Sequence, residues 1–176
     1  MKAAFLIVDM QKAFFAMEAC RPSLNSALEY VNATAELFRR QNSPVFIIQD
    51  NEAGGGPDKP GFGLFDGLVK DRHDRYVAKD YSNSFWKTSL EQDLKKAGCP
   101  FLIVSGFAAS GCVLYTYNGA LERGFKAALL QHGIAGFKDA HIQMALETCD
   151  VISYSVLEHL LKEPALKKGG RREGGA

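Results

Sequence analysis

The sequence lacks both an excess of charge of one sign and any long apolar run. Its 21 basic and 20 acidic residues leave a formal net charge of +1, so no overall field would recruit nucleic acid or an anionic membrane surface. No stretch approaches the roughly 18 apolar residues of a membrane span. The first apolar run is interrupted by Asp9, and no small-residue cleavage site of a secretory signal follows it. These absences predict a cytoplasmic protein that binds neither nucleic acid nor membranes.

Paired cysteines and clustered histidines are also missing. The four cysteines are irregularly spaced and form no C-x-x-C pair, so we expect reduced thiols in place of a disulfide scaffold, a redox dithiol or a metal cluster. The four histidines show no spacing typical of metal ligands. We therefore predict no metal site and no cofactor.

The apolar pattern alternates between strands and helices. Buried strands are expected at residues 3–8, 45–48, 76–78, 101–105, 126–130 and 151–153. Helices are expected at residues 22–41, 88–97, 112–121, 139–148 and 155–161, with Thr88 and Glu91 forming a capping box and Asp139 capping its helix. This alternation predicts an α/β fold: a three-layer α/β/α domain with a six-stranded, mostly parallel, Rossmann-like sheet.

We expect that domain to span residues 1–163. Residues 164–176 are basic and glycine-rich, which indicates a disordered tail first and a weak anion-binding patch second. Between residues 49 and 75 the periodicity is lost, apart from one expected turn of helix near residues 64–69. A loop of this length is either a binding loop or lid, or a surface connection without a role in the site.

The stretch around Cys112 organises the chain. An apolar strand, a turn of small residues and a helix follow one another here, which places Cys112 at a helix N-terminus. Unpaired backbone N–H groups and the helix dipole favour a thiolate at such a position, and a thiolate is a nucleophile. The alternative is a structural cysteine, because free cysteines are often buried.

Two charged residues end strands in the same way. Asp9 follows the first strand and Lys79 follows the third, and parallel strands end at the edge where open α/β sheets bind ligands. Asp9 would accept the thiol proton, Lys79 would hold the anions in place, and Cys112 would attack an electron-poor carbonyl. Without such a site, Asp9 would be a turn former and Lys79 a solvated charge.

Three stretches in order, FLIVDMQKAF, YVAKDYSNSFWKTSL and IVSGFAASGCVLYTYNGALERGF, resemble the isochorismatase-like cysteine hydrolases, which include nicotinamidase and N-carbamoylsarcosine amidohydrolase. The resemblance implies that Asp9 is the base, Lys79 the supporting cation and Cys112 the nucleophile that forms an acyl-enzyme. It also implies a cis peptide at Phe107–Ala108, with the amides of Ala108 and Cys112 as the oxyanion hole. Relatives form dimers or tetramers, so a homo-oligomer is expected.

The sequence departs from parts of this family pattern. Isochorismatases lack the cysteine, so Cys112 favours cleavage of an amide over a vinyl ether. Nicotinamidases carry an Asp-x-His metal motif after the second strand, where this chain has Asp50, Asn51 and Glu52. The stretch Gln131-His132-Gly133 follows the fifth strand, where relatives commonly have an aspartate.

Several aromatic residues are candidates for substrate binding because they lie on the loops that reach this edge. Each has a core position as its alternative, since aromatic residues dominate interiors. The candidates are Phe14, Phe62, Tyr81, Phe85, Trp86 and Tyr115, with Phe65 as a further one.

These observations predict a metal-independent cysteine hydrolase that cleaves a carbon–nitrogen bond of a small amide, carbamoyl or ureido substrate through an acyl-enzyme on Cys112. The alternative is a catalytically silent binding or assembly protein with the same fold. A redox-responsive thiol protein ranks last, because no second cysteine lies near Cys112 in the sequence.

Overall fold

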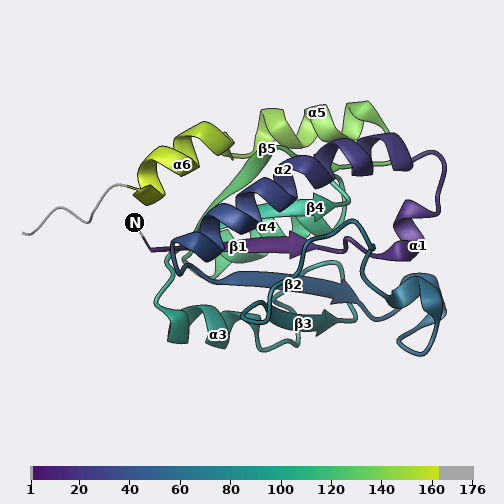
Figure 1. Cartoon of the computed structure of the whole chain (residues 1–176), viewed down its shortest axis with the longest axis horizontal. Helices are drawn as coiled ribbons and strands as arrows, with labels where there is room; N and C mark the ends of the chain where they lie inside the picture. The colour runs from purple at the N-terminus through teal and green to yellow at the C-terminus, as the bar shows by residue number, and fades with distance from the viewer. Residues whose placement is uncertain (1, 163–176) are drawn as a thin grey trace, which may run out of the picture.

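A six-stranded sheet lies at the centre of the molecule, in the order β3-β2-β1-β4-β5-β6 (Figure 1). The computed structural model describes residues 2–162, so the tail predicted at residues 164–176 lies outside the described residues. All neighbouring strands are parallel. The predicted α/β fold is confirmed, and the sheet is parallel throughout. The strands are β1 (Ala3–Val8), β2 (Val45–Asp50), β3 (Arg75–Lys79), β4 (Phe101–Phe107), β5 (Lys126–Ala135) and β6 (Val151–Ile152).

Helices cover both faces of this sheet (Figure 1). One face packs against α1 (Lys12–Phe15), α2 (Arg21–Arg40) and α6 (Tyr154–Lys162). The other packs against α3 (Leu90–Ala97), α4 (Cys112–Glu122) and α5 (Asp139–Thr148). All six residues of β1 are buried, because a central parallel strand is covered on both sides. No helix described between residues 2 and 162 is long and apolar enough to cross a membrane.

Strand β5 is longer than predicted. It continues to Ala135, past the expected end at residue 130. Its register with β4 shifts between Val104 and Gly106, and His132 adopts a left-handed φ of 62° within the extra segment. The polar residues that predicted a strand end belong to a β-bulge. A bulge accommodates polar residues within a strand because its extra residues are left unpaired.

The long loop has a different local structure from the one expected. The predicted turn of helix near residues 64–69 is wrong, and two short 3-10 helices precede it instead, η1 (Ala53–Gly55) and η2 (Pro60–Phe62). Their backbones touch so closely that a Cβ on Gly54 would lie 2.5 Å from the Gly61 Cα. Leu64 then pairs with Gln11 in an isolated antiparallel bridge, which takes its backbone out of a helical conformation.

Two predicted helix caps are also wrong. Ser89 occupies the N-cap of α3, while Glu91 pairs with Lys95 and Arg123 rather than reaching back to Thr88. Lys138, not Asp139, is the N-cap of α5. In the first case, two cations lie within reach of Glu91 and compete with the capping box for its carboxylate.

Candidate active site

The side chains of Asp9, Lys79 and Cys112, here called the strand-end cluster, meet at the carboxyl edge of the sheet. Asp9 follows β1, Lys79 ends β3 and Cys112 opens α4. The Lys79 Nζ lies 2.9 Å from the Asp9 Oδ2 and 3.3 Å from the Cys112 Sγ. The structure thus brings together the three residues singled out in the sequence, across 103 positions of chain from 9 to 112.

The backbone around Asp9 is tightly constrained. Asp9 has a left-handed φ of 53°, which is uncommon for a residue with a side chain. Its amide donates to the Ile48 carbonyl of β2 at 2.9 Å. On the other side, Gly106 pairs with Val8, and a Cβ at Gly106 would lie 2.0 Å from the Val8 carbonyl oxygen. These contacts hold the Asp9 side chain in a fixed, buried position, 1% exposed.

Burial and the neighbouring charges set the protonation of Asp9 and Lys79. Burial raises the pKa of Asp9 to about 6, and the Lys79 ammonium limits the rise. Burial disfavours the charged form of Lys79 as well, but Asp9, Cys112 and Asp50 together raise its pKa above the ordinary lysine value. At neutral pH the pair is therefore a carboxylate and an ammonium.

Cys112 is a thiol at rest, contrary to the expectation from its helix position. Burial and the Asp9 carboxylate raise the pKa of Cys112 to about 12 and outweigh the Lys79 ammonium. The sequence indicated the helix N-terminus but not the burial of a carboxylate beside the sulfur. A proton must therefore leave the sulfur during the reaction, and Asp9 is the base next to it.

The turn between β4 and α4 presents two free amides. The peptide bond between Phe107 and Ala108 is cis. Within this turn, Ala109 donates to the Ala135 carbonyl, and Gly111 and Val113 donate to the Ala108 carbonyl. Among the described residues, the Ala108 and Cys112 amides have no backbone acceptor. Both amides of the expected oxyanion hole are thus available to a ligand.

Sequence analysis missed the role of Asp50 as a neighbour of this cluster. The Asp50 Oδ2 lies 3.2 Å from the Lys79 Nζ. The signal was present, since Asp50 ends β2 as Lys79 ends β3, and the two are paired in register. From the sequence, Asp50 was compared only with the Asp-x-His metal motif, which this chain does not complete.

Gln11 was also missed, and it joins the long loop to the site. Its buried amide donates to the Asp50 carbonyl at 3.1 Å and the Phe62 carbonyl at 2.8 Å, and its Oε1 accepts from the Asp50 amide at 2.8 Å. A single polar residue after a strand gave no sequence signal for this role, because its partners lie 39 and 51 positions away.

The aromatic candidates separate into different environments. Phe85 is 4% exposed and packs against Phe125. It is therefore a core residue and does not line an open pocket. Phe14 is half-buried and packs against Phe107, and Phe62 is half-buried in η2. The remaining candidates do not share one environment: Tyr81, Trp86 and Tyr115 are 45%, 50% and 57% exposed, and Phe65 stacks on Phe15.

An aromatic wall lies beside the turn that carries the free amides. The Phe107 ring contacts Phe14 at 5.0 Å and Phe137 at 4.9 Å between centroids. Phe107 directly precedes Ala108, and Phe137 is 44% exposed. Sequence analysis named Phe14 as a substrate-binding candidate but not Phe107 or Phe137. The structure extends β4 to Phe107 and β5 to Ala135, and so brings Phe107 and Phe137 together.

His132 lies away from the strand-end cluster. Its ring packs against Tyr30 of α2 at 5.0 Å between centroids, and it lines a groove with Pro22, Ser26 and Asp139. His132 therefore belongs to the bulge of β5 and its contact with α2.

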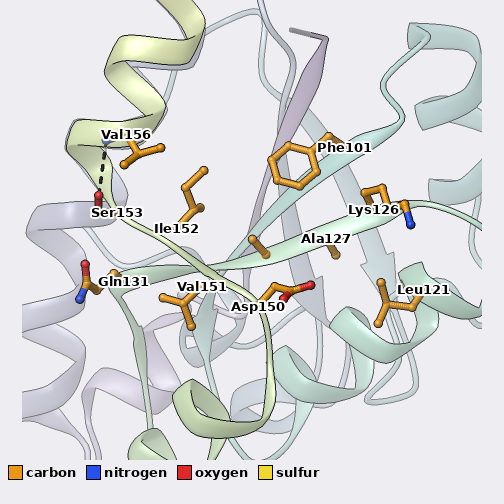
Figure 2. A pocket seen from close by; sticks show the side chains of 11 residues that line it. Phe101, Leu121, Lys126, Ala127, Gln131, Asp150, Val151, Ile152, Ser153 and Val156 are labelled. Carbon is orange, nitrogen blue, oxygen red and sulfur yellow. Dashed lines mark hydrogen bonds between the residues drawn. The ribbon is translucent and has the colours of Figure 1, made fainter.

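A cavity of about 830 Å³ lies elsewhere, along the open side of β5 and β6 (Figure 2). Figure 2 shows Phe101, Lys126 and Val156 among its lining side chains. No member of the strand-end cluster lines it. Cavity size therefore does not locate the reactive groups, which lie at the carboxyl ends of the strands.

Comparison with known proteins identifies the family of the chain. The family model for the isochorismatase domain matches residues 3–155. The chain belongs to the isochorismatase family. Nicotinamidase 3 of Arabidopsis thaliana is 28% identical over 154 residues, which cover 78% of this chain and 75% of that protein. The secreted isochorismatase effector Isc1 of Verticillium dahliae is 28% identical, over 67% of this chain and 60% of the effector.

Solved structures of the family share the fold. An isochorismatase-like hydrolase from Alkaliphilus metalliredigens has a TM-score of 0.83 at 20% identity, over 91% of this chain and 99% of that one. N-carbamoylsarcosine amidase from Thermoplasma acidophilum has a TM-score of 0.71 at 22% identity, over 82% of this chain and 93% of that one. The predicted membership in the isochorismatase-like cysteine hydrolases is confirmed.

A family metal site does not fit the residues of this chain. A pyrazinamidase from Pyrococcus horikoshii has been solved in complex with zinc. In the described part of this chain, the potential ligand group at the site is Asp9, Asp50 and Cys112, without an imidazole. The Lys79 ammonium lies within 3.3 Å of a side-chain atom of each. A positive charge that close would repel a metal cation.

Proposed function

We propose that this protein is a cysteine hydrolase that cleaves a carbon–nitrogen bond of a small amide, carbamoyl or ureido compound. The observation that carries the proposal is the position of the Lys79 Nζ, which contacts both the Asp9 carboxylate and the Cys112 sulfur. The arrangement brings together a base, a cation and a nucleophile, with Asp9 and Lys79 buried and Cys112 half-buried.

In the first half of the reaction, the Cys112 sulfur attacks the carbonyl carbon and its proton moves to Asp9. A carbon–sulfur bond forms, and the carbonyl oxygen becomes an oxyanion that the Ala108 and Cys112 amides stabilise. The carbon–nitrogen bond then breaks, and Asp9 returns the proton to the leaving nitrogen. The products are ammonia or an amine and a thioester on Cys112.

In the second half, water attacks the thioester carbonyl and gives a proton to Asp9. The carbon–sulfur bond breaks, the sulfur recovers the proton from Asp9, and the acid product leaves. Lys79 remains an ammonium throughout and balances the negative charge as it moves from Asp9 to the sulfur and back.

The acyl part of the substrate would lie against the aromatic wall of Phe14, Phe107 and Phe137. This wall adjoins Ala108, whose amide would bind the oxyanion. The names of two relatives support the bond type: nicotinamidase and N-carbamoylsarcosine amidase.

The test is turnover of a panel of small amide, carbamoyl and ureido compounds, measured by release of ammonia or amine. We expect Cys112→Ala to lose turnover by about 10³-fold or more with an unchanged unfolding transition. Cys149→Ala, at another half-buried cysteine, is the matched control and should keep wild-type turnover. Mass spectrometry of the quenched wild-type reaction should show an acyl adduct on Cys112.

Two results would contradict the proposal. One is wild-type turnover by Cys112→Ala. The other is failure of the whole panel together with a Cys112 that reacts with iodoacetamide no faster than Cys149. The second result would favour a catalytically silent binding or assembly protein.

A further inference from the structure

The Lys79 ammonium contacts three neighbouring groups. It donates to the Asp50 Oδ2 at 3.2 Å and to the Cys112 Sγ at 3.3 Å, and it forms an ion pair with the Asp9 Oδ2 at 2.9 Å. The Lys79 side chain is 0% exposed, so the ammonium depends on these three groups, and not on bulk water, for its contacts. Asp50 is therefore part of what determines where the ammonium lies.

Asp50 is itself held from three directions. Its Oδ1 accepts the Glu52 amide at 2.8 Å, which leaves Oδ2 facing Lys79. Its backbone amide and carbonyl both bond to the buried Gln11 side chain. Asp50 also pairs with Lys79 in the register of β2 and β3. A carboxylate fixed in this way is able to impose a position on the longer, more flexible lysine.

The ammonium takes the place that a cation would occupy among these acidic groups. Ligand atoms of Asp9, Asp50 and Cys112 lie within 4.8 Å of one another, and two carboxylates that close repel unless a positive charge lies between them. Lys79 supplies that charge from within the chain.

We propose that Asp50 is a positioning residue, which holds the Lys79 ammonium between Asp9 and Cys112 in a site that uses this ammonium in place of a metal. The role rests on the proposed function, since it concerns the activation of Cys112. It assigns to Asp50 no contact with substrate.

Two substitutions separate the geometry from the charge. Asp50→Ala removes the acceptor, so the ammonium loses one of its three contacts and shifts away from the sulfur. Asp50→Asn keeps an acceptor oxygen but removes a negative charge. Asp80→Asn is the matched control, because Asp80 is the next residue after Lys79 but its carboxylate bonds to Asn51 instead.

The experiment is the rate of Cys112 alkylation by iodoacetamide between pH 4 and 9, followed by peptide mass spectrometry. It needs no substrate, so it distinguishes failure of this proposal from failure of the proposed function. The groups that face Asp9 are Lys79, Cys112 and Asp50. In the wild type, we expect the rate to rise as Asp9 ionises and then to level off.

We expect Asp50→Ala to lower the plateau rate by about tenfold or more, since small displacements of a reacting group have effects of this size. Asp50→Asn should keep most of the plateau rate, and its acid limb should move to lower pH because Asp9 loses a neighbouring negative charge. Asp80→Asn should match the wild type in its plateau rate and in the pH of its acid limb.

Three outcomes would overturn the proposal. A wild-type plateau in Asp50→Ala would show that Asp50 does not position Lys79. Equal slowing in both Asp50 variants with an unmoved acid limb would indicate a general structural role. A wild-type rate that falls with a chelator and recovers with Zn²⁺ would make Asp50 a metal ligand.

Discussion

The Lys79 ammonium reaches from β3 across β2 to the Asp9 carboxylate after β1, where the two side chains meet at 2.9 Å and are 0% and 1% exposed. Neither charge is solvated, so each depends on the other to remain ionised. The pair joins two strands that are not neighbours in the sheet. The ionisation of this pair therefore affects both the reactivity of Cys112 and the stability of the carboxyl edge of the sheet.

Activity should depend on the ionisation of Asp9. The pKa of Asp9 is about 6 in the folded protein, and only its carboxylate form accepts the thiol proton. Turnover should therefore fall about tenfold per pH unit below pH 6. A pH–rate profile of kcat/KM checks this. An unchanged rate down to pH 4.5 would exclude Asp9 as the base.

Lys79→Met should abolish activity and destabilise the protein in a pH-dependent way. The variant leaves Asp9 and Asp50 without their cation, which should cost about 3–5 kcal/mol at pH 8. The folded-state pKa of Asp9 is already above its unfolded value and would rise further. The folded variant then binds a proton that the unfolded chain has released, so its stability falls as pH rises above about 4.

Urea unfolding of Lys79→Met and wild type at pH 5 and pH 8 measures this difference. The loss of unfolding free energy in Lys79→Met should be smaller at pH 5, where Asp9 is protonated in the variant. Lys126→Met, at a lysine without an ion pair among the described contacts, is the control and should change stability by less than about 0.5 kcal/mol. An equal loss at both pH values would contradict the assignment.

Gly106→Ala should disrupt the sheet beside Asp9. A Cβ there would lie 2.0 Å from the Val8 carbonyl oxygen, at a left-handed φ of 103°. The clash is with backbone, so we expect unfolding free energy to fall by more than about 3 kcal/mol. Gly124→Ala is the control: its φ is 79°, but nothing lies within 4 Å of the new Cβ. It should cost roughly 1–2 kcal/mol. Equal losses would show that backbone conformation alone matters.

Gln11→Ala should release the long loop. The change leaves the Asp50 amide without its Gln11 acceptor and removes one of the two side-chain donors to the Phe62 carbonyl, which keeps Gln49. This should cost about 1–3 kcal/mol. Limited proteolysis should then cut faster within residues 51–63 than in the wild type. Gln143→Ala removes an exposed glutamine that bonds only to the Glu147 side chain. It should leave the cleavage rate unchanged, and faster cutting in that control would mean the effect is not specific to the loop.

Much of the fold followed from local pattern. Apolar runs located β1 and β4, and the stripe of α2 was correctly placed, because a strand covered on both faces and an amphipathic helix leave periodic signals. The same pattern placed Asp9, Lys79 and Cys112 at strand and helix ends. Where the conformation of a residue depends on its neighbours along the chain, the sequence was sufficient to predict it.

Only the tertiary structure decided the state of the site. It placed Asp50 on Lys79, tied the loop to Gln11, and made Cys112 a thiol by burying it beside Asp9. It also moved Phe85 into the core and assembled the wall around Phe107. Burial and charge pairing act through space between residues that are distant in the chain. The sequence by itself therefore determined which reactive groups reach the edge of the sheet, and long-range packing determined their protonation and their partners.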